Sequence, residues 1–162
     1  MSRKALPSGT SVGMTPADEA TARSLIMSLL YRYASLAREE GDHTATAKLF
    51  EADGVIQFQD GREIAPSDLG VITRRNPPKL LRHHLTTINI QFVSSEEVNC
   101  QSYIIAGSHL RMPDHWGRWD DTVRKQGDGT WLFKSKSVIV DGLDPVGWLA
   151  ETIAIESSVE QE

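Results

Sequence analysis

The sequence has a single cysteine, no long hydrophobic run and no excess of basic residues. One thiol, Cys100, cannot form an internal disulfide, which fits a reducing compartment, and its strand-like surroundings predict a buried, inert side chain. The longest apolar stretches, such as residues 138–140, are far too short to cross a bilayer. Lys and Arg number 17 against 22 Asp and Glu, so the net charge of −5 provides no basic surface for nucleic acid or an anionic membrane.

Signatures of metal and cofactor sites are also missing. The five histidines have no accompanying cysteine pair or His-x-x-x-His helix, and His83 and His84, as neighbours on a strand, point to opposite faces. The sequence has no glycine-rich loop of the kind that holds a phosphate. We therefore expect neither a metal ion nor a cofactor. Residues 1–15 lack an apolar segment of signal-peptide length, so we interpret them as a flexible tail and expect a cytoplasmic protein.

The N-terminal half of the chain carries helical signals. Thr15 and Pro16 are typical of a helix start, and apolar residues then recur at helical spacing. Asp42 is suited to cap a second helix. In chain order, the patterns predict a first helix that starts at residue 16 and is ended by Gly41, and a second helix that runs to about residue 50. A short strand at 54–58, a turn at 60–61 and a short helix at 65–73 follow.

The C-terminal half is dominated by strand patterns. They predict four long strands, at 84–93, 97–107, 116–125 and 130–141, and a last helix at 147–155. Helices followed by a meander of strands indicate an α+β fold: a cone-shaped barrel made of a strongly bent mixed or antiparallel sheet, covered by the N-terminal helices around a central pocket. We expect this cone domain at 16–145, between the 1–15 tail and a C-terminal helix or tail at 146–162. The broad outer face of the sheet favours a homodimer, with a homotrimer as the alternative.

His84 stands at the start of an alternating strand. Every second residue from His84 onward shares one face, which becomes apolar through Ile88 and Ile90. An imidazole titrates near neutral pH, so on the wall of an apolar pocket it is suited to general acid–base chemistry. A hydrogen-bonded histidine of the core or rim is the alternative.

The order of several short segments resembles the SnoaL-like branch of the nuclear transport factor 2-like superfamily. These segments extend over about residues 20–143 and comprise Tyr31–Ala34, Gly41–Asp42, Leu49–Phe50, Arg82–Thr87, Gly117–Asp121 and Gly129–Phe133. Members of this superfamily include scytalone dehydratase, a dehydrochlorinase, polyketide cyclases and ketosteroid isomerase, as well as non-catalytic oxygenase subunits. The resemblance implies the cone fold, whereas the reaction differs from member to member.

The resemblance also implies a catalytic pair. In the dehydratase and dehydrochlorinase group, a histidine that enters this strand is paired with an acid near the end of the first helix, which gives these roles to His84 and Glu39. The family usually has Asp at the acid position, so Glu39 is a departure, and Asp42 is the fallback. The scytalone dehydratase pattern has a second histidine near His109, where it would protonate a leaving hydroxyl.

Further side chains complete the expected pocket. Tyr33 keeps the apolar phase of the first helix, so its hydroxyl either donates to a substrate oxygen or packs in the core. Asp120 and Asp121 are neighbours on one strand and therefore point to opposite faces. Asp121 shares the face of Trp119, so we expect Asp121 to be the buried acid unless a bulge exchanges the two. The resemblance places Lys136 where some relatives carry Arg. The substrate-binding residues that we expect are Trp119, Asp120, Lys136, Phe58 and Ile88.

We therefore expect a cofactor-independent lyase or isomerase, a dehydratase or cyclase acting on a hydrophobic, oxygenated small molecule such as a polyketide or terpenoid. His84, oriented by Glu39, would remove a proton, while Tyr33, His109 or Asp121 would stabilise or protonate the reacting oxygen. The alternative is a non-catalytic subunit of the same fold that binds a small molecule or a partner. In that case Glu39 and His84 would lie too far apart even for a water-bridged contact.

Overall fold

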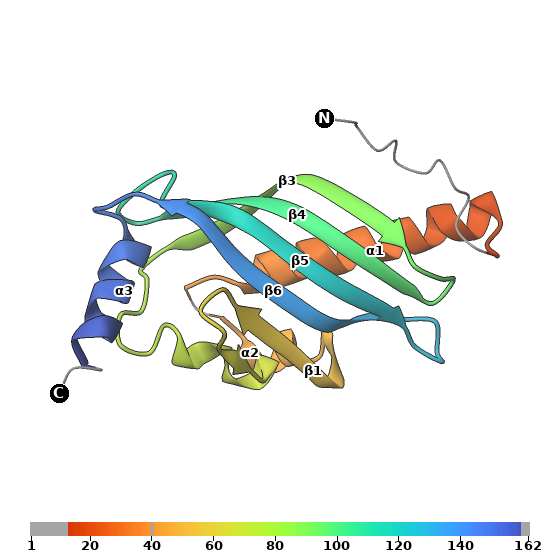
Figure 1. The fold of residues 1–162 in the computed structure, drawn as a ribbon, viewed down its shortest axis with the longest axis horizontal. Coiled ribbons are helices and arrows are strands. Elements are labelled where there is room, and N and C mark those ends of the chain that lie inside the picture. The colour runs from red at the N-terminus through yellow and green to blue at the C-terminus, as the bar shows by residue number, and fades with distance from the viewer. Residues whose placement is uncertain (1–12, 40, 160–162) are drawn as a thin grey trace.

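The structure, a computed structural model of the protein, describes residues 13–39 and 41–159 and confirms the α+β fold (Figure 1). Most of the tail expected at 1–15 lies outside the described residues. The helices are α1 (Pro16–Leu36), α2 (His43–Ala47), a 3-10 helix (Pro66–Val71) and α3 (Trp148–Val159). The strands are β1 (Phe50–Phe58), β2 (Glu63–Ile64), β3 (Leu81–Phe92), β4 (Glu97–Ser108), β5 (His115–Lys125) and β6 (Trp131–Leu143). No helix in the described part of the chain is long and apolar enough to span a membrane.

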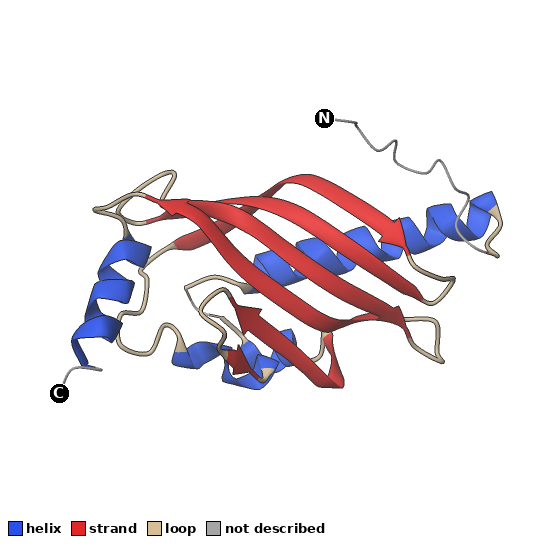
Figure 2. Ribbon diagram, viewed as in Figure 1, coloured by secondary structure: helices blue, strands red, loops and turns tan. Residues whose placement is uncertain are grey.

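The strands form one twisted sheet in the order β2-β1-β6-β5-β4-β3. β1 and β6 pair in parallel and the other neighbours pair antiparallel, so the sheet is mixed. Within the described residues its edge strands, β2 and β3, do not pair with each other, so the sheet is open rather than a closed barrel. α1 runs along one face of the sheet, and α3 lies at the end where β6 finishes (Figure 2).

α1 begins where the local signals predict. Thr15 accepts a hydrogen bond from the backbone N–H of Asp18 at 3.2 Å, and Pro16 occupies the first turn. One stripe of the helix is buried: Ala22, Ile26, Leu29, Leu30, Tyr33 and Leu36. Within this stripe Tyr33 packs edge-on against three core rings, those of Phe50, Trp119 and Phe133. These contacts hold α1 against the inner face of the sheet.

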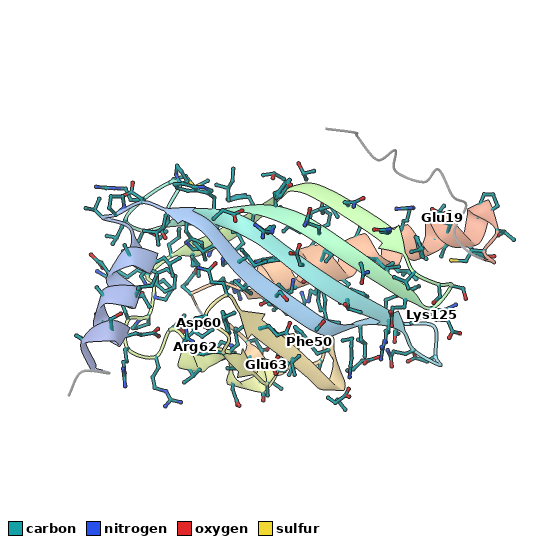
Figure 3. All side chains as sticks on the ribbon, viewed as in Figure 1. Glu19, Phe50, Asp60, Arg62, Glu63 and Lys125 are labelled. Carbon is teal, nitrogen blue, oxygen red and sulfur yellow. The ribbon has the colours of Figure 1, made fainter. Side chains whose placement is uncertain are left out.

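After α1, the second helix is shorter and the first strand is longer than expected. α2 is capped by Asp42 as expected but ends at Ala47, and β1 already starts at Phe50, which pairs with β6. The short helix expected after the β1–β2 turn is a 3-10 helix. In the turn itself, Arg62 Nε donates to Asp60 Oδ2 at 2.7 Å (Figure 3).

A bulge in β3 changes which of its side chains face the core. Between Leu85 and Ile88 the strand advances by three residues while its partner β4 advances by two. Consequently His83 and Leu85 turn inward before the bulge, and Ile88 turns inward after it. The alternation expected from His84 onward is therefore wrong at its first positions, because His84 is exposed on the outer face.

A second bulge lies in β6. Between Thr122 and Val123 of β5, the partner strand β6 advances by two residues instead of one. Phe133 faces the core, and Lys136, three residues later, also faces the core, directly opposite Asp121. Because positions 133 and 136 have opposite parity, a regular strand would have placed Lys136 on the outer surface.

Candidate functional site

Six polar side chains lie between α1 and the inner face of the sheet. They form what we call the inner polar cluster: Tyr33 of α1, His83 of β3, Ser102 of β4, His115 and Asp121 of β5, and Lys136 of β6. The indole of Trp119 connects them, since its centroid is 5.1 Å from the Tyr33 ring and 5.4 Å from the His83 ring. Lys136 Nζ lies 4.4 Å from the same centroid, and Ser102 is the direct cross-strand neighbour of Trp119.

Lys136 and Asp121 form an ion pair whose side chains have no exposed surface. Lys136 Nζ donates to both carboxylate oxygens at 2.8 Å and lies 4.3, 4.4 and 4.6 Å from the ring centroids of Tyr33, Trp119 and Phe133. Burial lowers the pKa of Lys136 and raises the pKa of Asp121, while the charge of each opposes the shift of the other. The pair places a cation, surrounded by aromatic faces, in the low-dielectric interior.

His83 is held in one tautomer. Its Nδ1 lies 2.8 Å from the carbonyl oxygen of Ala37, the C-cap residue of α1. Since a carbonyl oxygen only accepts, Nδ1 carries the proton and Nε2 is unprotonated in the neutral ring. Burial and the nearby His115 lower the pKa of His83 to about 4, so the ring is neutral at pH 7. A neutral imidazole with a free Nε2 is able to accept a proton.

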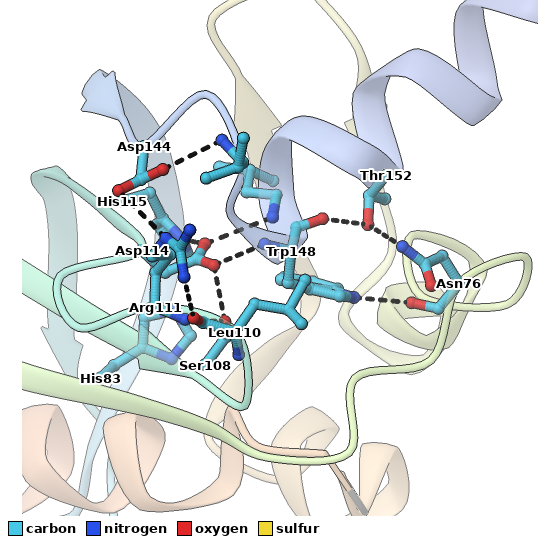
Figure 4. A network of polar contacts seen from close by, with 12 residues as sticks. Asn76, His83, Ser108, Leu110, Arg111, Asp114, His115, Asp144, Trp148 and Thr152 are labelled. Atoms are coloured by element: carbon cyan, nitrogen blue, oxygen red, sulfur yellow. Dashed lines mark hydrogen bonds and ion pairs between the residues drawn. The ribbon is translucent and has the colours of Figure 1, made fainter.

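His115 forms a second hydrogen-bonded unit with Asp114 (Figure 4). His115 Nδ1 lies 2.8 Å from Asp114 Oδ1, and the ring centroids of His115 and His83 are 5.5 Å apart. Although burial opposes it, hydrogen bonds from His115, Ser108 and the backbone of α3 lower the pKa of Asp114. The carboxylate is therefore ionised and accepts the Nδ1–H of His115, which leaves Nε2 of His115 unprotonated in the neutral ring.

Several expected pocket residues lie in this cluster or beside it. Burial, followed by the charge of Asp121, raises the pKa of the Tyr33 hydroxyl, which therefore stays protonated. Asp121 is the buried member of its pair as expected, whereas Asp120 forms its hydrogen bonds on the outer surface of the sheet. Phe58 and Ile88 are partly buried and pack against the core.

Three expected catalytic residues lie elsewhere. His84 is on the outer side of β3 because of the bulge, and His109 is exposed in the loop after β4. Glu39 forms an ion pair with Arg82 and accepts a hydrogen bond from Leu81 N at 3.0 Å, contacts that lower the pKa of Glu39 to about 2. Within the described residues no hydrogen bond or ion pair joins Glu39 to a histidine, so the expected contact with His84 is not formed.

A hollow of about 300 Å³ opens between α1 and the start of β3. Its wall includes Tyr31, Ala34, Arg38, Arg82, His83 and His84. His83 belongs both to this wall and to the inner polar cluster, so it lies between the surface and the interior. His84 contributes to the outer part of the same wall.

The sequence-based expectations did not include His83, His115 or Ser102 as pocket groups. His115 was predictable in principle, because buried residues alternate along β5 and His115 shares the parity of Trp119 and Asp121. Ser102 shares the buried parity of β4, and its hydroxyl is buried without a hydrogen-bond partner in the described part of the chain. Such a hydroxyl gains a hydrogen bond when a polar ligand enters. Among the described residues, no group of three or more His, Cys, Asp or Glu side chains is arranged to hold a metal ion.

Comparison with known proteins agrees with this fold. A family model described as a SnoaL-like domain matches residues 18–137. No curated protein sequence matches the chain. Among solved structures, a putative scytalone dehydratase from Novosphingobium aromaticivorans is 21% identical, with a TM-score of 0.66 over 80% of this chain and 91% of that chain.

Two further solved structures have a similar degree of likeness. A hexachlorocyclohexane dehydrochlorinase from Novosphingobium barchaimii is 14% identical, with a TM-score of 0.67 over 80% of this chain and 93% of that chain. A protein of unknown function from Mycobacterium tuberculosis is 21% identical, with a TM-score of 0.70 over 88% of this chain and 90% of that chain. At these identities the three structures share a fold with the chain.

Proposed function

The chain belongs to the SnoaL-like domain family, and on that premise we propose that it is a cofactor-independent acid–base lyase or isomerase. Within this class we propose a dehydratase or cyclase whose substrate is a hydrophobic, oxygenated small molecule such as a polyketide or terpenoid. The observation that carries the proposal is the neutral, tautomer-fixed His83, which packs on the same indole as the buried Lys136 cation. A base and a cation in one dry site suit a reaction that removes a proton and builds negative charge on an oxygen.

In this proposal His83 takes the role that the resemblance implied for His84. Its Nε2 removes a proton from the carbon next to a substrate carbonyl. Lys136, kept positive by Asp121, stabilises the oxygen on which negative charge develops. Tyr33, whose hydroxyl stays protonated, donates to that oxygen or to a departing hydroxyl.

Dehydration is the first choice among the reactions that begin with this proton transfer. Two of the structural neighbours are named as a dehydratase and a dehydrochlorinase, and both names describe eliminations. Cyclisation and double-bond isomerisation are the other candidates, because each also starts with proton removal in an apolar pocket.

Proton removal is measurable before the substrate is known. The protein is incubated in D2O with a panel of hydrophobic ketones and β-hydroxyketones, and deuterium uptake at the α-carbon and loss of water are followed by NMR and mass spectrometry. We expect catalysed exchange with at least one compound, and a loss of about 10²–10⁴-fold in His83→Ala. His84→Ala is the matched control, because His84 is the neighbouring but exposed imidazole. Equal exchange by wild type and His83→Ala would contradict the proposal.

A non-catalytic binding subunit is the second candidate. The observation that favours it is the engagement of Glu39 by Arg82 and Leu81, which leaves the implied acid–histidine pair unformed. Under this alternative, calorimetry would detect binding of one of the ketones, while deuterium uptake would stay at the rate of buffer alone.

We also propose that the protein is a homodimer, with a homotrimer as the alternative. Tyr103, Ile105 and Trp116 are 47%, 38% and 41% exposed on the outer face of the sheet, and Ile105 and Trp116 are direct cross-strand partners. Such an apolar patch favours contact with a second copy. Light scattering should give a multiple of the 18.0 kDa chain mass, and Tyr103→Lys combined with Ile105→Lys should give the monomer. A monomeric wild-type protein would refute this assignment.

A further inference from the structure

α3 begins without a capping side chain of its own (Figure 4). Gly147 precedes its first residue, Trp148, and has no side chain to accept the free N–H groups of the first turn. Asp114, 34 residues earlier than Trp148, fills this role. Trp148 N donates to Asp114 Oδ2 at 2.6 Å, and Leu149 N donates to Asp114 Oδ1 at 3.2 Å.

The same carboxylate also accepts hydrogen bonds from two side chains of the sheet. Ser108 Oγ donates to Asp114 Oδ2 at 2.6 Å, and His115 Nδ1 donates to Oδ1 at 2.8 Å. Each oxygen of Asp114 thus has one partner in α3 and one in the sheet. Because the side chain of Asp114 has no exposed surface, water has no access to replace a partner that moves away.

The position of α3 relative to Asp114 is tightly fixed. A Cβ added to Gly147 would lie 2.7 Å from Asp114 Oδ2, closer than any side-chain carbon packs. On the other side of the helix, Trp148 Nε1 donates to the carbonyl oxygen of Asn76 at 2.8 Å, and Asn76 Nδ2 donates to Thr152 Oγ1 at 3.1 Å. A shift of α3 therefore changes the hydrogen bonds that Asp114 makes.

We propose that Asp114 is a positioning residue that couples the docking of α3 to the two imidazoles of the inner polar cluster. With α3 seated, Asp114 holds His115 as the Nδ1–H tautomer beside His83. When α3 is displaced, the carboxylate loses two N–H donors, and the imidazole of His115 reorients with it. Any effect of this coupling on catalysis rests on the proposed function, whereas the coupling between α3 and the imidazoles does not depend on it.

The test displaces α3 without touching either imidazole. Gly147→Ala crowds Asp114 from the helix side, and long-range ¹H–¹⁵N spectra of the full-length, histidine-labelled protein report the tautomer of each ring. We expect the wild type to show His115 protonated at Nδ1, and Gly147→Ala to show a second His115 species together with shifted His83 resonances. The resonances of the exposed His84 and His109 should not move.

Two further variants keep the test decisive. Ala154→Gly loosens the exposed middle of α3 away from Asp114 and should leave both inner imidazoles unchanged. Asn76→Ala removes only the bond to Thr152 and should produce a smaller change of the same kind, which serves if Gly147→Ala does not fold. The proposal is overturned if Gly147→Ala and Asn76→Ala lower the melting temperature but leave His115 and His83 as in the wild type. If the imidazoles respond but no ketone exchanges its proton, the coupling stands and the proposed function fails.

Discussion

Separating the Lys136–Asp121 pair should destabilise the protein far more than removing both of its members. In Asp121→Asn the ammonium group of Lys136 stays among three aromatic rings and loses its counter-charge. In Lys136→Met the carboxylate of Asp121 is left alone in the same apolar surroundings. The double variant Asp121→Leu/Lys136→Met leaves no charge at this buried position.

The expected sizes follow from the complete burial of the pair. Removing one partner of a buried ion pair costs about 3–5 kcal/mol, because the remaining charge is desolvated without compensation. Replacing both by apolar groups of similar volume ranges from neutral to stabilising by about 1–4 kcal/mol. Since whole domains are stable by about 5–15 kcal/mol, each single variant should lose a large part of its folding free energy.

The two single variants should also respond to pH in opposite directions. Burial keeps the pKa of Lys136 below that of the unfolded chain, so the stability of Asp121→Asn should rise as the pH increases toward about 10. Burial keeps the pKa of Asp121 above that of the unfolded chain, so the stability of Lys136→Met should fall as the pH rises above about 4.

Urea unfolding at several pH values measures these differences. Lys134→Met is the matched control, because Lys134 precedes Lys136 on the same strand but pairs with the exposed Asp53, and its unfolding midpoint should change little. Equal losses in the single and double variants would refute the reasoning, since they would show that the contacts of each side chain, and not the uncompensated charge, determine the cost.

Three further outcomes are expected. The pKa of His83 is about 4 in the folded protein and about 6.5 in an unfolded chain, so stability should fall as the pH decreases from 6.5 to 4. His83→Gln should flatten this part of the urea-derived stability curve, and an unchanged slope would contradict the burial of the ring. Ser102→Ala removes an unpartnered buried hydroxyl and should be neutral or stabilising by up to about 1 kcal/mol in the same assay, whereas a clear loss would reveal a hidden partner. Glu39→Gln should lower the free energy of unfolding by less than about 1 kcal/mol and leave α-proton exchange at the wild-type rate. A loss of exchange would show that Glu39 takes part in the reaction.

The elements of the fold were predictable because their signals are local. Thr15 and Pro16 mark the start of α1 through hydrogen bonds and backbone angles within one turn. Cys100 is buried as expected from its strand, and burial raises the pKa of its thiol to about 12. Closure of the sheet into a barrel was not predictable in the same way, since it depends on whether β2 and β3 meet across the whole molecule.

The candidate site was predictable only in part, for a specific physical reason. Strand parity correctly predicted that Asp121 is the buried member of its pair, because β5 alternates regularly around it. The same rule failed at His84, because the bulge in β3 arises from pairing with β4 and leaves no mark in the local pattern of the sequence. Lys136 was placed in the expected pocket by the family resemblance. Strand alternation counted from the buried Phe133 would have placed its side chain on the outer surface.

The two bulges make the chemistry of the interior depend on chain length as well as on residue identity. Each bulge is one additional residue, which lets side chains of opposite parity on its two sides face the core together. Deleting Thr87 should give a regular strand in which Leu85 still pairs with Ile104 and Ile88 still pairs with Ser102. His83 should therefore still face inward and His84 stay exposed, and chemical modification of the two imidazoles would detect any exchange. The position of the extra residue along β3 therefore determines which of the two neighbouring imidazoles faces the interior, independently of any substitution.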